Sequence, residues 1–142
     1  VLVEGADGTL HTNYEGKAKA AVDGLLKDGY DFAYIHVEAP DEMGHQGSVE
    51  RKVQAIELLD ARLIRYVKEA MDASGEDYRM LILPDHPTPI EVRTHTSEPV
   101  PYLLYDSTNL QENDWEYSER CAEAGGICHP RGHELIDYLF SK

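Results

Sequence analysis

The stretch "DFAYIHVEAPDEMGHQG", residues 31–47, carries a compact apolar run directly into a cluster of polar side chains. Its beginning is rich in aromatic and β-branched residues, which predicts a buried strand. The remainder places Asp41 and His45 four positions apart, with Pro40 and Gly44 beside them. Polar side chains that follow a buried strand fit either an ordinary acidic loop or half of a metal site.

Helical patterns flank this stretch on both sides. The preceding pattern has an Ala and Leu face, with Asn13 as the expected N-cap and Gly29 as the expected stop. The following helix is expected to be capped by Ser48 and to run through about Ser74. Asp60 falls on its apolar stripe, so we expect a buried carboxylate that accepts hydrogen bonds rather than a catalytic group. The stripe itself comprises Val49, Val53, Ile56, Leu63, Val67 and Ala70.

The second half of the chain continues the alternation of extended and helical patterns. Residues 78–84 and 100–105 predict two more strands, and residues 117–124 and 132–140 predict helices. Strands separated by long helices require right-handed crossovers, so we expect an α/β fold with a mainly parallel sheet flanked by helices. Ligands in such sheets bind beyond the carboxyl ends of the strands. A chain of 142 residues is expected to form one domain or a piece of a larger one.

Composition narrows the classes of partner. The formal net charge of -14 argues against nucleic acid and against anionic membrane surfaces, since both attract clustered Lys and Arg. No apolar stretch approaches the roughly 20 residues that span a bilayer, and no signal peptide is recognisable, so a cytoplasmic protein is expected. Cys121 and Cys128 are expected to be free thiols. A zinc site at Cys128 and His133 is disfavoured, because the spacing matches no standard ligand pattern.

A second polar cluster follows the strand expected at residues 78–84. Asp85 and His86 are adjacent there, and His95 comes later in "RTHT". With Asp41 and His45 they offer two carboxylates and three imidazoles, a donor set suited to zinc or manganese. Such a set exceeds the needs of one tetrahedral ion, so two neighbouring metal ions would use it better.

Three motifs resemble those of the cofactor-independent phosphoglycerate mutases, in particular the archaeal-type branch within the alkaline phosphatase superfamily. They are "GTLHTNYEGKAKAA", "HVEAPDEMGH" and "DHPTPIEVRTHTSEPVPYLLY". The resemblance implies a partial alkaline phosphatase-like core and two divalent metal ions, which would be Mn, Zn or Mg. It also implies that Asp41, His45 and His95 hold one ion, and that Asp85 and His86 help to hold the other.

The same resemblance implies that residues 1–142 form only the C-terminal part of the metal-binding core. The family's nucleophilic serine, an aspartate near the N-terminus and the inserted domain have no counterpart in this chain. The parent protein would interconvert 3-phosphoglycerate and 2-phosphoglycerate in glycolysis and gluconeogenesis. This chain would contain no catalytic nucleophile and would be inactive alone.

Smaller expectations concern cations and hydroxyls near these motifs. Lys17 and Arg93 are candidates for contact with substrate phosphate or carboxylate, although a solvated cation explains either one equally well. His36 is expected to lie in the core or to support a ligand rather than to bind metal. Nothing marks a substitute nucleophile among the nearby threonines Thr88, Thr94 and Thr96.

Three alternatives to a mutase stay open at this point. The same metal shell supports a phosphohydrolase or another phosphotransferase of the superfamily. A further alternative is a non-catalytic domain that binds a metal or a partner protein. An exposed face of the core would also lead to self-association.

Overall fold

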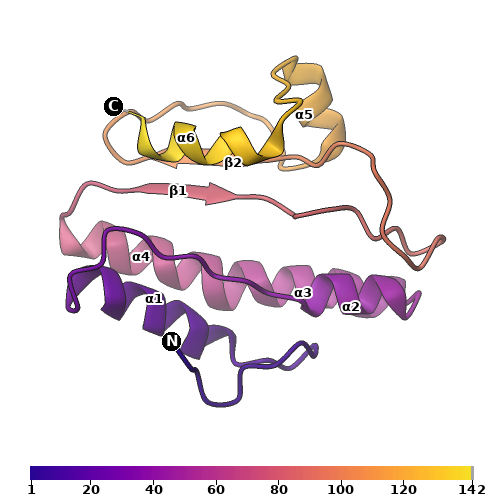
Figure 1. Cartoon of the computed structure of the whole chain (residues 1–142), viewed down its shortest axis with the longest axis horizontal. Coiled ribbons are helices and arrows are strands. Elements are labelled where there is room, and N and C mark those ends of the chain that lie inside the picture. The colour runs from indigo at the N-terminus through magenta and orange to yellow at the C-terminus, as the bar shows by residue number, and fades with distance from the viewer. Residues whose placement is uncertain (142) are drawn as a thin grey trace. The chain divides into compact units, whose positions relative to one another are not determined.

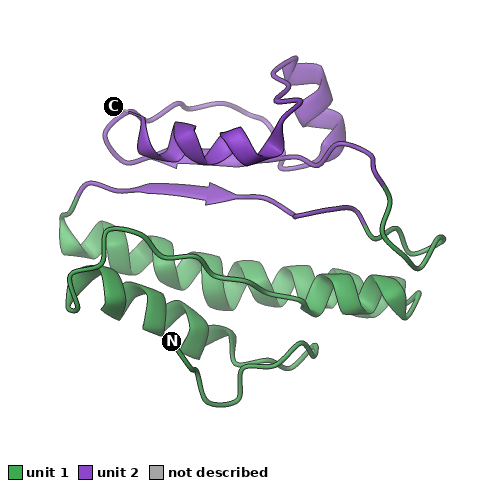
Figure 2. Ribbon diagram, in the orientation of Figure 1, with its two compact units in different colours: residues 1–76, 88–96 green, residues 77–87, 97–142 purple. Residues whose placement is uncertain are grey.

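The computed structural model describes residues 1–141 and divides the chain into two compact units (Figure 2). Unit 1 consists of residues 1–76 and 88–96, and unit 2 consists of residues 77–87 and the chain from residue 97 onward. The chain therefore passes from unit 1 to unit 2 and back before it ends in unit 2. The sequence predicted a single core, and each unit is described separately below.

Unit 1 contains the two helical stretches that the sequence predicted (Figure 1). The first, α1 (Tyr14–Leu26), begins at Asn13, whose side chain accepts a hydrogen bond from the Gly16 amide at 2.9 Å. The second begins after Ser48, whose hydroxyl accepts from the Arg51 amide at 3.3 Å. It ends before Gly75, which has a φ of 75°. Its consecutive parts are α3 (Val49–Leu59), the π-helical turn η1 (Asp60–Ile64) and α4 (Arg65–Ser74).

The π-helical turn changes which face of this long helix is buried. The Arg65 amide bonds to the Asp60 carbonyl, one residue further back than in an α-helix. One extra residue rotates the helix after the turn by about 100°. Ala55 before the turn and Leu63 within it are both buried in the same cluster. The predicted core stripe is therefore wrong in its first half, and so is the predicted burial of Asp60, which is exposed. The exposed positions of that stripe are Val49, Val53 and Ile56.

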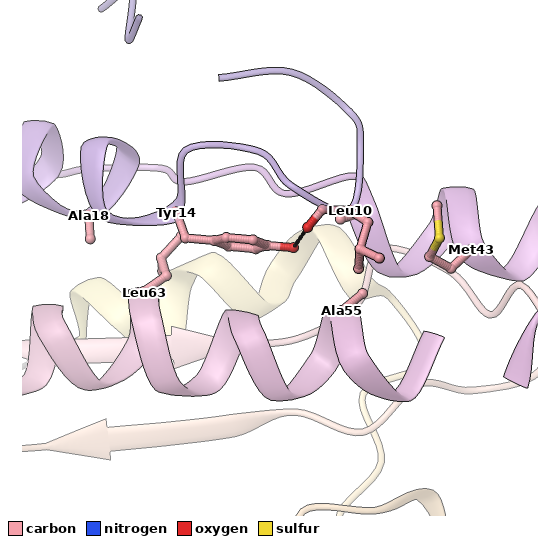
Figure 3. Packing of buried hydrophobic residues seen from close by; sticks show 7 residues of the cluster. Leu10, Tyr14, Ala18, Met43, Ala55 and Leu63 are labelled. Carbon is pink, nitrogen blue, oxygen red and sulfur yellow. Dashed lines mark hydrogen bonds between the residues drawn. The ribbon is translucent and has the colours of Figure 1, made fainter. Parts of the chain in front are cut away.

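The core of unit 1 is built on Tyr14, which is fully buried (Figure 3). Its hydroxyl donates to the carbonyl of Leu10 at 3.0 Å, so the one polar atom of the ring is satisfied inside the core. The ring packs in a cluster with Ala18 of α1 and with Ala55 and Leu63 of the long helix. Small alanine side chains allow these helices to approach each other closely. The other buried members of this cluster are Leu10, Ala39 and Met43.

Residues 31–37 form no strand, which corrects the prediction from their composition. A strand needs a hydrogen-bonded neighbour, and the described part of the chain pairs no strand with this segment. Ile35 and Val37 instead pack against the core of unit 1. The ammonium group of Lys17 donates to the His36 carbonyl at 2.8 Å and so ties the segment to α1.

Unit 2 contains the two strands predicted in the second half of the chain, but they are antiparallel. Strand β1 (Arg79–Ile82) pairs with β2 (Leu103–Asp106), with Arg79 opposite Asp106 and Ile82 opposite Leu103. The prediction of a mainly parallel sheet is not confirmed. Parallel pairing requires a crossover, usually helical, and the connection of residues 83–102 contains no helix.

The helices of unit 2 are short. Helix α5 (Glu119–Gly125) begins after Ser118, whose hydroxyl accepts from the Cys121 amide at 3.3 Å. The single 3₁₀ turn η2 (Gly132–Glu134) leads into α6 (Leu135–Phe140), which packs against β1. Within residues 1–141, no helix combines the length and apolar character needed to cross a membrane.

A charged network joins the two strands of unit 2. The Arg79 guanidinium donates to Asp106 Oδ2 at 2.6 Å across the ladder. Asp106 Oδ1 accepts from the hydroxyl and amide of Thr108 at 2.7 and 2.9 Å. The Thr108 hydroxyl, Arg79 and the Thr108 amide together lower the pKa of Asp106 to about 2.

The buried Tyr14 hydroxyl generates a first prediction. Tyr14→Phe leaves the Leu10 carbonyl without its buried donor, so we expect the free energy of unfolding to fall by about 1–2 kcal/mol. Urea denaturation followed by circular dichroism measures this change. Tyr34→Phe is the matched control, because Tyr34 is 75% exposed. Equal stability of the two variants would contradict the assigned role of the Tyr14 hydroxyl.

The Asp106 network predicts a specific pH dependence. Because the folded pKa lies below the ordinary value of 3.8, ionised Asp106 stabilises the fold above about pH 4, and this contribution is lost as the pH falls through 2. Asp106→Asn should therefore lower stability at pH 7, and its difference from the natural chain should shrink between pH 4 and pH 2. Urea denaturation at several pH values measures this, with the exposed Asp114→Asn as control. A difference that does not depend on pH would refute the role of the charge.

Candidate metal centre

Helix α2 (Ala39–His45) places Asp41 and His45 on one face, because residues four apart lie one turn from each other. The sequence predicted a loop here. Pro40 lies in the first turn, where a missing amide hydrogen costs nothing, so it favours the start of the helix. The result is a separation of 3.3 Å between Asp41 Oδ2 and His45 Nε2.

The segment of residues 88–96 brings His95 to the same place. The amides of Val92 and Arg93 both donate to the Pro89 carbonyl, at 3.0 and 2.8 Å, and close a tight turn. The turn ends at Arg93, which has a φ of 58°, a left-handed conformation that is costly for a residue with a side chain. His95 Nε2 then lies 3.2 Å from His45 Nε2 and 3.4 Å from Asp41 Oδ1.

The carbonyl of Arg93 determines the tautomer of His45. His45 Nδ1 lies 3.0 Å from this oxygen. A carbonyl can only accept, so Nδ1 carries the hydrogen and donates it, and the lone pair of the neutral ring is on Nε2. Metal-binding histidines are commonly oriented by a bond of this kind. Arg93, which has a left-handed backbone, thus supplies the carbonyl that bonds to His45.

The three side chains, called the Asp–His–His cluster below, fit a divalent metal ion. One ligand atom from each residue can be chosen so that all three lie within 4.8 Å of one another, which is close enough for a shared ion. Carboxylate and imidazole are ligands of zinc and manganese alike. The side chains of Asp41, His45 and His95 are 29, 35 and 51% exposed, so an ion and a substrate can reach them.

Asp85 and His86, the other predicted ligands, belong to unit 2. His86 Nε2 lies 3.3 Å from Asp85 Oδ2, and the His86 amide donates to Asp85 Oδ1 at 3.1 Å. Their assignment to a second ion stays a prediction. In the described part of the chain, the Asp–His–His cluster is the group of three or more ligand side chains that converges on one point.

The two predicted substrate-binding cations already have structural contacts. Lys17 bonds to the His36 carbonyl. The exposed Arg93 side chain lies against Gly47, where a methyl group would come within 2.8 Å of its Cζ atom. Lys17 has two further N–H donors beyond this bond, and Arg93 has five N–H donors, so a role with substrate stays a prediction for each. Cys121 and Cys128 are free thiols, as the sequence predicted.

Comparison with known proteins defines the class to which this site belongs. The family model of the Metalloenzyme superfamily matches residues 1–142, so the chain belongs to that superfamily. The PH0037 protein from Pyrococcus horikoshii is a structural neighbour, with a TM-score of 0.81 and 35% identity over 97% of this chain and 40% of that chain. The family and this neighbour together point to an alkaline phosphatase-like fold.

The curated relatives narrow the class further. The 2,3-bisphosphoglycerate-independent phosphoglycerate mutase of Methanothrix thermoacetophila is 44% identical over 98% of this chain. A probable enzyme of the same name from Geobacter sulfurreducens is 41% identical over the whole chain. The match covers 35% of each relative, so this chain spans about a third of their length.

The geometry of the cluster predicts the effect of removing its ligands. Asp41→Ala or His45→Ala should weaken Zn²⁺ binding by more than the roughly 10–100-fold that the loss of a supporting residue costs. Isothermal titration calorimetry on the 142-residue chain measures this. His11→Ala is the matched control, since His11 is an exposed histidine of unit 1 outside the cluster. Unchanged Zn²⁺ affinity in both ligand variants would exclude the cluster as the binding site.

Proposed function

We propose that the protein to which this chain contributes is a metal-dependent phosphoglycerate mutase that interconverts 3-phosphoglycerate and 2-phosphoglycerate in glycolysis and gluconeogenesis. The convergence of Asp41, His45 and His95 is the observation that carries the proposal. Membership of the Metalloenzyme superfamily and the names of the relatives support the choice of reaction. A divalent ion at this cluster would supply positive charge directly at the transferring phosphoryl group.

The cluster holds one divalent ion in this proposal, and Asp85 with His86 helps to hold a second. Such ions supply positive charge that neutralises a transferring phosphoryl group. The chain itself carries a formal net charge of -14 and would repel an anionic phosphoglycerate, so local positive charge is required. His45 contributes by presenting its Nε2 lone pair, while its Nδ1 hydrogen is engaged by the Arg93 carbonyl.

Lys17 and Arg93 are the residues we assign to the substrate. The Lys17 ammonium uses one of its three N–H donors on the His36 carbonyl, which fixes its position and leaves two donors for a phosphate or carboxylate. Arg93 presents an exposed guanidinium suited to a bidentate contact. We place the nucleophile and the remaining ligands in the part of the relatives that this chain does not span.

An enolase-coupled assay with Mn²⁺ tests this function on the full-length protein and on this chain in parallel. We expect conversion of 3-phosphoglycerate by the full-length protein and none by the 142-residue chain. Asp41→Asn in the full-length protein should abolish the conversion, while His11→Ala should not. Phosphate release from an ester without mutase turnover would move the assignment to a phosphohydrolase. Mutase turnover by the isolated chain would refute its assignment as an inactive portion.

A further inference from the structure

Thr88 is a buried threonine in the segment that closes over helix α2. Thr88 is only 4% exposed, although its segment forms no helix or strand. Pro87 and Pro89 flank it. Proline has a fixed φ and restricts the residue before it to extended conformations, so the backbone at Thr88 has little freedom.

The position of Thr88 is held from two sides. Its carbonyl accepts a hydrogen bond from the Lys52 ammonium at 2.6 Å. Gly44 of α2 permits the close approach, because a methyl group there would come within 2.6 Å of the same carbonyl oxygen. With the backbone fixed in this way, the Thr88 hydroxyl donates to Asp41 Oδ1. This hydroxyl therefore bonds directly to a side chain of the Asp–His–His cluster.

We propose that Thr88 is a positioning residue that orients the Asp41 carboxylate for metal binding, and that Lys52 holds Thr88 in place for this purpose. A carboxylate rotates freely about its terminal torsion angle unless a hydrogen bond fixes it. With Oδ1 engaged by the Thr88 hydroxyl, Asp41 presents Oδ2 to His45 Nε2 at 3.3 Å and Oδ1 to His95 Nε2 at 3.4 Å. The proposal rests on the metal centre assigned above and adds two residues that prepare it.

Thr88 and the Arg93 carbonyl then have parallel tasks. The carbonyl selects the tautomer of His45, and the hydroxyl sets the rotation of Asp41. Both come from the segment of residues 88–96, which also supplies His95. Bonds to metal ligands from supporting residues typically change metal affinity by about 10–100-fold. Loss of the Thr88 hydroxyl should therefore reduce affinity without removing a ligand.

Titration of Co²⁺ into the 142-residue chain, followed by the visible absorption of the bound ion, tests the proposal. Thr88→Val removes the hydroxyl and keeps the shape, so we expect affinity to fall about 10–100-fold and the spectrum to change. Thr88→Ser keeps the hydroxyl and should restore both. Thr108→Val is the matched control, because the Thr108 hydroxyl donates to Asp106, a carboxylate of unit 2 outside the cluster, at 2.7 Å.

The outcomes separate this inference from the proposed function. If the natural chain binds no Co²⁺, the metal centre itself is refuted. If the natural chain and Thr88→Val bind Co²⁺ equally and with the same spectrum, only the role of Thr88 is refuted. If circular dichroism shows that Thr88→Val does not fold, Lys52→Met provides the test. That variant should bind Co²⁺ several-fold more weakly, and unchanged binding would overturn the proposal.

Discussion

The contact of residues 88–96 with helix α2 is the constraint on which the site depends. The segment lies against α2 at Gly44, and a side chain there would collide with the Thr88 carbonyl. This contact brings His95 to Asp41 and His45 across some fifty residues of sequence. It also delivers the Thr88 hydroxyl and the Arg93 carbonyl to the first two ligands. One contact between two segments thus assembles the three ligands and the two groups that orient them.

The two residues that orient the ligands of this site, Thr88 and Arg93, both have constrained backbones. Arg93 adopts a left-handed backbone conformation, and Thr88 is confined between two prolines. The carbonyl of Arg93 bonds to Nδ1 of His45. A divalent ion held by Asp41, His45 and His95 would give this acidic chain a local positive charge that its sequence as a whole lacks.

The sequence predicted features that depend on local chemistry and missed those that depend on distant partners. Caps at Asn13 and Ser48 were predictable, because residues that can accept a hydrogen bond from the first turn of a helix are visible in the sequence.

Residues 31–37 resemble a strand, yet strand formation needs a hydrogen-bonded neighbour, which composition does not reveal. The π-helical turn left no signal in the apolar spacing, which predicted burial at Val49 and Val53 although both are exposed. At the site, residue types pointed to Asp41, His45 and His95, whereas the task of the Arg93 carbonyl rests on a φ angle that the residue type does not reveal.

Anomalous diffraction at the manganese edge, from crystals of this chain grown with Mn²⁺, tests the metal centre most directly. We expect a peak in direct contact with the Asp41 carboxylate and with Nε2 of both His45 and His95. The His45 Nδ1 atom should remain hydrogen-bonded to the Arg93 carbonyl. A peak elsewhere, or no peak at the Asp–His–His cluster at saturating Mn²⁺, would contradict the assignment.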